Sequence, residues 1–172
     1  MKILGGLKPT IPDRRDYKFG AIHKPINLNE IAGKDFDVWQ PDEILDQTVE
    51  LRDQDLCGGF GLAQILKAHE GLKLNPQYIF AKGKELEGDP ESFGLGLRTI
   101  FKVATKFGAI KDEDAPKEFL NIRDGNNWPF YLDEMAGAQK QQSYFFIEKD
   151  GYPDLFDSLR ASLWQYKEQR NI

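Results

Sequence analysis

The chain has 172 residues and a mass of 19.7 kDa, which is enough for one domain with a hydrophobic core. Its 40% hydrophobic and 12% aromatic residues exclude a disordered or collagen-like chain, and a mean hydropathy of −0.56 predicts a soluble protein. The net charge of −5 argues against a nucleic-acid partner, and no apolar run approaches the ~20 residues that span a bilayer.

Cys57 is the single cysteine, so one chain can form neither an internal disulfide nor a cysteine-based metal site. The first eight residues hold too short an apolar stretch for a signal peptide. The acidic clusters at 42–43 and 112–114 lack the pattern of a calcium loop. We therefore expect a reducing compartment such as the cytoplasm, no secretion by a signal peptide, no metal and no cofactor.

Residues 1–50 differ in composition from the rest of the chain. Proline fixes its own φ and pushes the preceding residue toward extended conformations, so this segment is expected to be an extended arm with short turns. Its prolines and glycines are Pro9, Pro12, Pro25, Pro41, Gly5, Gly6, Gly20 and Gly33. The apolar side chains that could pack it on the core are Tyr17, Phe19, Ile22, Ile26, Phe36, Val38 and Trp39.

Helical periodicity begins near Gly58 and ends at Gly71, a residue typical of a helix C-terminus. A second helix is predicted from Asn75 and Pro76, an N-cap followed by proline at the first helical position. The glycine-rich residues 88–96 read as a loop.

Further helices are predicted at 97–107, 129–138 and 154–169, and a strand rich in aromatic residues is predicted at 143–147. The fold class is therefore α+β, predominantly helical, with little β-sheet. We expect an arm at 1–50 and a helical lobe at 51–172 within a single domain.

Cys57 stands just before a predicted helix, where the partial positive charge of a helix N-terminus favours a thiolate nucleophile. A buried, inert cysteine is the simpler interpretation, since cysteine is among the most buried residue types. His69 lies twelve residues further, about 18 Å along a shared helix, which is too far to act as its base. His23 lies on the arm, and no neighbouring feature brings it to Cys57.

Gly58, Gly59 and Gly61 occupy the start of that helix, where glycine is unfavourable by about 1 kcal/mol relative to alanine. A tight turn, or the close approach of another backbone or a ligand, would explain them. The segment is no phosphate loop, because no Gly-Lys-Ser/Thr follows.

Several of these segments, in order, resemble papain-like cysteine peptidases of bacterial type. Residues 51–61, Leu-Arg-Asp-Gln-Asp-Leu-Cys-Gly-Gly-Phe-Gly, resemble the nucleophile segment, and 74–79, Leu-Asn-Pro-Gln-Tyr-Ile, the family's next helix start. Residues 94–98 resemble the glycine segment that lines the substrate cleft. Residues 107–116 and the Pro-Asp-Arg-Arg-Asp-Tyr at 12–17 also have counterparts. The likeness implies the helical left-hand lobe of that fold over roughly residues 9–165.

The resemblance also marks two departures from an active enzyme. The family's nucleophile lies six residues after a glutamine that donates to the oxyanion; six residues after Gln54 is Phe60, and Cys57 comes three residues too early. The catalytic His and Asn follow ~130–150 residues downstream, which here begins near position 190, beyond residue 172. The implied site Gln54, Cys57 and Phe60 is therefore degenerate, because nucleophile, base and orienting group act as a unit.

The resemblance thus predicts a non-catalytic structural or protein-interaction component, for example of a virus particle. Its partners would be other protein subunits bound through the former cleft face, an apolar surface on the helix near Phe60. The groove residues would be Gly58, Gly59, Gly94, Leu95 and Gly96. Two alternatives stay open: a cysteine peptidase, as a fragment or with Cys57 and a histidine from elsewhere, and a non-cleaving peptide-binding module.

Overall fold

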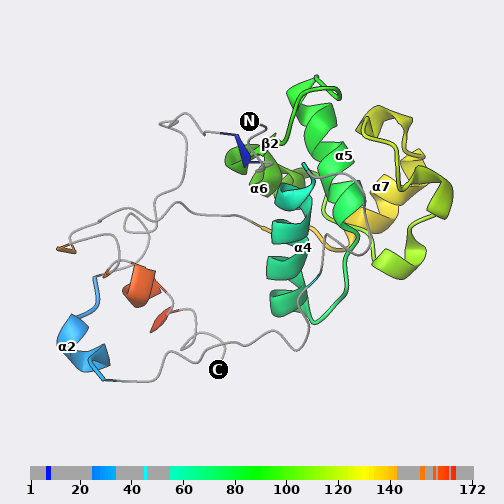
Figure 1. The fold of residues 1–172 in the computed structure, drawn as a ribbon. Coiled ribbons are helices and arrows are strands. Elements are labelled where there is room, and N and C mark those ends of the chain that lie inside the picture. Colours follow the sequence, from blue (N-terminus) through cyan, green and yellow to red (C-terminus); the bar gives the residue numbers. More distant parts are fainter. Residues whose placement is uncertain are drawn as a thin grey trace. The chain divides into compact units, whose positions relative to one another are not determined.

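The computed structural model describes residues 7–8, 25–33, 45, 55–142, 152–153, 157, 159–162 and 164–165, with only the backbone at 7–8 and 68–70. The chain forms two compact units (Figure 1). Unit 1 combines residues 1–11 with 41–143, and unit 2 combines 12–40 with 144–172. The division of the chain into an arm at 1–50 and a helical lobe at 51–172 stays a prediction.

Unit 1 is built on three helices whose ends the sequence predicts well. Helix α4 (Cys57–Glu70) ends at Gly71, whose φ of 71° is left-handed and whose N–H donates to the Lys67 carbonyl at 2.7 Å. Helix α5 (Pro76–Glu87) begins where the Asn75 side chain accepts the Tyr78 N–H at 2.8 Å. Helix α6 (Leu97–Lys106) follows after the glycine-rich segment.

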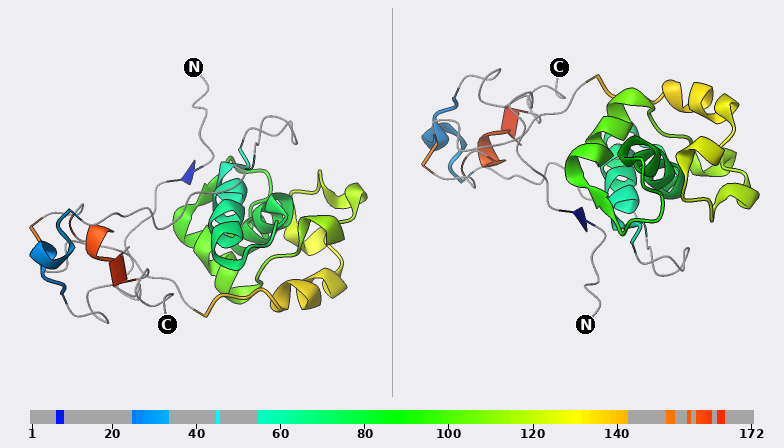
Figure 2. Two further views of the ribbon diagram at one scale, coloured as in Figure 1. Left: turned by 90° about the horizontal axis from the view of Figure 1, so that it is seen from below. Right: turned by 90° about the horizontal axis from the view of Figure 1, so that it is seen from above.

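Helix α5 is the most enclosed of the three, since every residue from Pro76 to Lys84 is buried. Figures 1 and 2 show why: α4 and α6 lie on one side of α5, and α7 (Phe130–Gly137) lies on the other. One cluster of buried side chains joins α4, α5 and α6. It comprises Leu56, Phe60, Leu62, Ala63, Leu66, Leu74, Ile79, Phe80, Leu95, Ile100, Val103, Ala104 and Ala109.

A second buried cluster joins α5 to α7 and to Ile110 and Trp128. Between Ile110 and Trp128 the chain forms three short 3-10 turns, η1 (Asp112–Asp114), η2 (Lys117–Phe119) and η3 (Gly125–Asn127). The Tyr78 ring meets Trp128 edge-on, with centroids 5.4 Å apart and planes at 77°. The Tyr78 hydroxyl donates to Asp133 at 2.7 Å. Burial, together with this hydrogen bond, raises the pKa of Tyr78 far above its ordinary value, so it stays a neutral donor.

The described residues are mostly helical, as predicted, with one two-stranded parallel sheet between β1 (Leu7–Lys8) and β2 (Leu95–Gly96). Leu7 pairs with Leu95 and Lys8 with Gly96. The prediction of an unbroken loop over 88–96 is therefore wrong at its last two residues. Strand pairing with a segment almost ninety residues away in the sequence leaves no local signal.

Unit 2 contains a helical turn, α2 (Leu28–Ile31), where the sequence predicts only extended structure with short turns; Asn27 caps it by accepting the Asn29 N–H at 3.1 Å. The Ile26 N–H donates to the Tyr152 hydroxyl at 2.7 Å, which joins two distant segments of this unit. Residues 157, 159–162 and 164–165 are helical, in agreement with the helix predicted at 154–169.

The strand predicted at 143–147 lies outside the described residues, as do the arm's anchors Tyr17, Phe19, Ile22, Phe36, Val38 and Trp39. Among the helices that the structure describes, none combines the length and the apolar composition needed to cross a membrane.

Candidate functional site

The candidate site lies where the first turn of α4 meets the glycine-rich segment before α6. Cys57 is the first residue of α4 and is half-buried. The Phe60 N–H donates to the Leu56 carbonyl at 3.1 Å, which closes the first turn of the helix. The Phe60 side chain is 6% exposed and belongs to the core cluster of unit 1. At this helix start the aromatic ring is therefore part of the hydrophobic core.

Gly58 and Gly59 are buried because two other helices approach the α4 backbone closely. A Cβ on Gly59 would lie 2.3 Å from the Pro76 carbonyl oxygen of α5, and one on Gly58 would lie 2.5 Å from Cδ1 of Ile100 on α6. Such a Cβ on Gly59 would collide with backbone, which cannot rotate away as a side chain can. The close approach that the sequence suggested is thus one between helices. Gly61 is exposed, with open space around it.

A buried ion pair fixes the glycine-rich segment to the start of α4. Two guanidinium nitrogens of Arg123 donate to the two carboxylate oxygens of Asp55 at 2.9 and 2.7 Å, and the Gly94 N–H donates to Oδ2 at 3.0 Å. Arg123 also donates to the carbonyls of Pro90 at 3.0 Å and Ser92 at 3.1 Å. Asp55 is 3% exposed. Arg123 therefore ties Asp55, two residues before α4, to Pro90 and Ser92 of the loop.

These contacts set the charge state of Asp55. Burial alone raises its pKa, but the hydrogen bonds from Arg123 and from the Gly94 N–H outweigh burial and hold the pKa below the ordinary value of 3.8. Asp55 is consequently an anion at neutral pH, and it serves the loop as an acceptor.

Lys84, which is 0% exposed, holds the same loop from the other side. Its ammonium donates to the Ser92 hydroxyl at 2.9 Å, to the Gly94 carbonyl at 2.6 Å and to the Ser92 carbonyl. Both cations lie near the Phe80 ring, whose centroid is 5.1 Å from Lys84 Nζ and 5.0 Å from Arg123 Cζ. The loop that reaches β2 is thus held by the buried Lys84, the partly exposed Arg123 and the carboxylate of Asp55.

Sequence reasoning missed Asp55, Lys84 and Arg123. Lys84 stands four residues after Phe80, so helical periodicity alone placed it on the inward face of α5. That signal was available for Lys84, but a lysine at such a position is ordinarily taken as exposed. Arg123 lies 68 residues from Asp55, and no spacing rule connects them.

No family model matches the sequence, and no curated protein matches it. Among solved structures, the cysteine protease xylellain from Xylella fastidiosa is similar, with a TM-score of 0.63 and 16% sequence identity. The match covers 92% of this chain and 63% of the xylellain chain, so this chain spans less than two thirds of its length.

This chain has a papain-like fold. At 16% identity the likeness concerns the fold alone. It bears out the fold that the ordered motifs of the sequence implied, and it agrees with the mostly helical architecture.

The structure describes only part of the site that the papain-like resemblance marked. Gln54 and His23 lie outside the described residues. His69 belongs to α4, as does Cys57, which leaves the two residues about 18 Å apart along the helix axis. Gly94 and Leu95 are buried and Gly96 is half-buried, on the loop that Asp55 and Lys84 hold.

No group of three or more His, Cys, Asp or Glu side chains within the described ranges could hold a metal ion. The acidic cluster at η1 has a structural role, because Asp112 accepts from the Asn75 side chain at 2.9 Å and pairs with Lys73 at 3.3 Å. What the arrangement offers chemically is a rigid backbone edge beside the start of α4.

Proposed function

We propose that this chain is a catalytically inactive papain-like domain that acts by binding other protein subunits, as a structural or interaction component of a larger assembly such as a virus particle. The observation that carries the proposal is the buried side chain of Phe60 at the start of α4. The resemblance puts the family's nucleophile at this position. A phenyl ring has no ionisable proton and no lone pair with which to attack a carbonyl.

The position of Cys57 supports the same proposal. Cys57 is one helical turn before Phe60, at the first residue of α4. His69, on the same helix, is about 18 Å away along the axis, beyond any hydrogen bond. Among the residues that the structure describes, no histidine therefore lies near Cys57, and a papain-like nucleophile depends on such a base for activation.

The first test is selective labelling of the one thiol. The full chain is treated in parallel with an epoxysuccinyl peptide inhibitor and with iodoacetamide, and mass spectrometry follows the adduct on Cys57. We expect iodoacetamide to react and the epoxide to react no faster than it does with free cysteine. The Cys57→Ala variant, which should take up neither reagent, is the control. Selective modification by the epoxide would favour the cysteine peptidase alternative and overturn the proposal.

A non-cleaving peptide-binding module is the second candidate, and the β1–β2 pairing favours it. The segment at Leu95 and Gly96 already accepts an extended segment of this chain in parallel register. Strand addition to an exposed backbone edge is a common mode of peptide recognition. The hydrogen bonds from Arg123 and Lys84 hold the neighbouring loop and keep that edge rigid.

This candidate is tested with extended peptides added to isotope-labelled protein. We expect chemical-shift changes at the Gly94 and Gly96 amides, and larger ones in a Leu7→Pro variant, in which proline disfavours the competing β1 strand. If the chemical shifts of both amides stay unchanged in the wild type and in the Leu7→Pro variant, this would count against peptide binding at this segment.

A further inference from the structure

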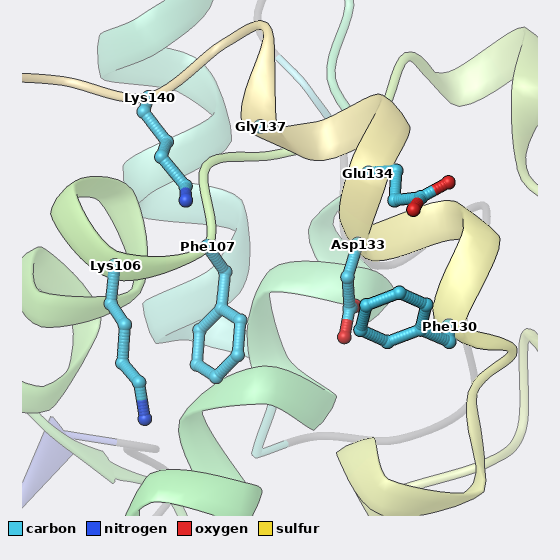
Figure 3. Close-up of a pocket in the computed structure, with 7 residues that line it drawn as sticks. All are labelled: Lys106, Phe107, Phe130, Asp133, Glu134, Gly137 and Lys140. Atoms are coloured by element: carbon cyan, nitrogen blue, oxygen red, sulfur yellow. The ribbon is translucent and has the colours of Figure 1, made fainter.

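A pocket of about 400 Å³ opens between the C-terminal end of α6 and helix α7, away from the glycine-rich segment. Leu97 and Lys106, at the two ends of α6, lie about 14 Å apart along its axis. Figure 3 shows Lys106, Phe107 and Lys140 on one side of the pocket and residues of α7 on the other. The α7 residues are Phe130, Asp133, Glu134 and Gly137.

The α7 side of this pocket presents unusual apolar exposure. Phe130 is 74% exposed, the largest value among the exposed large hydrophobic side chains of the described residues. Tyr131 at 52% and Met135 at 42% are exposed on the same eight-residue helix, but they do not line the pocket. Leaving a phenyl ring in water forgoes the favourable free energy of burying it. An apolar group placed between Phe130 and Phe107 would recover that burial.

The acidic and basic side chains around the pocket differ in how far the described residues compensate their charges. Asp133 accepts from the Tyr78 hydroxyl at 2.7 Å and pairs with buried Lys82 at 2.8 Å, so its charge is already compensated. Lys106 and Lys140 are exposed, and neither forms an ion pair with the part of the chain that the structure describes.

Two lysine ammonium groups lie close to the ring of Phe107. The Phe107 centroid lies 4.9 Å from Lys106 Nζ and 5.2 Å from Lys82 Nζ. In Figure 3 the Lys140 ammonium points into the space above Phe107, whereas the Glu134 carboxylate points away from both lysines. The wall opposite α7 is therefore positive, within a chain whose net charge is −5.

We propose that this pocket binds an acidic segment of a partner protein, with an apolar side chain between Phe107 and Phe130 and a flanking carboxylate at Lys106 and Lys140. An acidic partner fits because two exposed cations line the wall, and neither pairs with a carboxylate of the described residues. An apolar anchor fits because the Phe130 ring on one side of the space is 74% exposed, and the Phe107 ring on the other side is half-buried. This site is independent of the proposed inactivity of Phe60 and of the edge at β2.

The test uses two fluorescein-labelled, terminally blocked peptides, Glu-Asp-Trp-Leu-Asp-Glu and its amide counterpart Gln-Asn-Trp-Leu-Asn-Gln, titrated with the full chain and followed by fluorescence anisotropy. We expect the acidic peptide to bind about tenfold more tightly than the amide peptide at low salt, and the difference to shrink as salt is added. Equal affinity for both peptides, or no binding of either, would overturn the proposal.

Matched variants locate the binding. Lys140→Glu and Phe130→Ser should each weaken binding of the acidic peptide about tenfold. Lys117→Glu and Phe93→Ser change an exposed lysine and an exposed phenylalanine elsewhere in unit 1, and they should leave binding within about twofold. Circular dichroism and melting temperature verify that all four fold. An equal loss in the control variants would show diffuse attraction and would contradict the assigned site.

Discussion

Two guanidinium nitrogens of Arg123 donate to the two carboxylate oxygens of Asp55, at 2.9 and 2.7 Å, although the residues are 68 positions apart in the sequence. The pair is buried on the Asp55 side, at 3% exposure, and partly open on the Arg123 side, at 22%. Because the same guanidinium also holds the carbonyls of Pro90 and Ser92, the pair connects the start of α4 to the glycine-rich loop.

We expect Asp55→Asn to lower the free energy of unfolding by about 3 kcal/mol at pH 7, since it removes one partner of a buried ion pair. The folded pKa of Asp55 lies below its ordinary value of 3.8. The stabilisation is therefore complete above pH 3.8 and is lost as the pH falls through the folded pKa. The difference between wild type and variant, measured by urea unfolding, should shrink below pH 3.8.

Asp114→Asn is the control for that experiment. Asp114 is exposed on η1, and its neutralisation should change stability by no more than about 0.5 kcal/mol at any pH. A difference for Asp55→Asn that stays constant from pH 7 to pH 3 would contradict the charged state assigned to Asp55.

Lys84→Met should loosen the loop without disturbing the helix that carries the lysine. Methionine keeps most of the buried chain but donates no hydrogen bond to Ser92 or Gly94. We expect faster amide hydrogen exchange at residues 92–96 and unchanged protection in the middle of α5. Lys102→Met, an exposed lysine of α6, provides the comparison. Unchanged exchange at 92–96 would show that Lys84 does not hold the loop.

Gly59 and Gly61, two residues apart on α4, should respond in opposite directions to alanine. A Cβ at Gly59 would lie 2.3 Å from the Pro76 carbonyl oxygen, so Gly59→Ala must push α5 away from α4 and destabilise the core. Gly61 faces open space, and Gly61→Ala should raise stability by about 1 kcal/mol through helix propensity. Thermal unfolding of the two variants measures the contrast; a stable Gly59→Ala protein would refute the close approach.

Phe60→Ala should cost about 3 kcal/mol of unfolding free energy, because it leaves a cavity among the packed side chains of α4, α5 and α6. Ile65→Ala on the same helix is the control, since Ile65 is 51% exposed and its loss should cost about 0.5 kcal/mol or less. Equal effects, measured by denaturant unfolding, would mean that Phe60 is not a core residue.

Local signals in the sequence predicted the three central helices closely. Gly71 ends α4, Asn75 with Pro76 begins α5, and α6 runs over Leu97–Lys106 within the predicted 97–107. Capping, left-handed glycine and helical periodicity depend on residues a few positions apart, so they can be recognised from one chain. The papain-like fold was likewise accessible, because its weak motifs occur in the right order.

Other features depend on partners far away in the sequence. Helical periodicity indicates that Lys84 lies on the inward face of α5, but no local signal indicates that its ammonium donates to the Ser92 and Gly94 carbonyls. Two further contacts join segments that no local rule relates: Leu7 pairs with Leu95, and Arg123 donates to Asp55. The pocket beside Phe107 forms only where two helix ends meet.

The sequence alone predicted the helix boundaries, the aromatic residue at the start of α4 and the likeness to the papain-like fold. Each of these depends on neighbouring residues or on the order of motifs. Tertiary structure decided which charged side chains are buried, how closely the helices approach Gly58 and Gly59, and which aromatic rings face water. The physical reason is that burial is a property of the packed chain: the cost of desolvating Lys84 or Asp55 is offset only by hydrogen-bond partners that folding brings together.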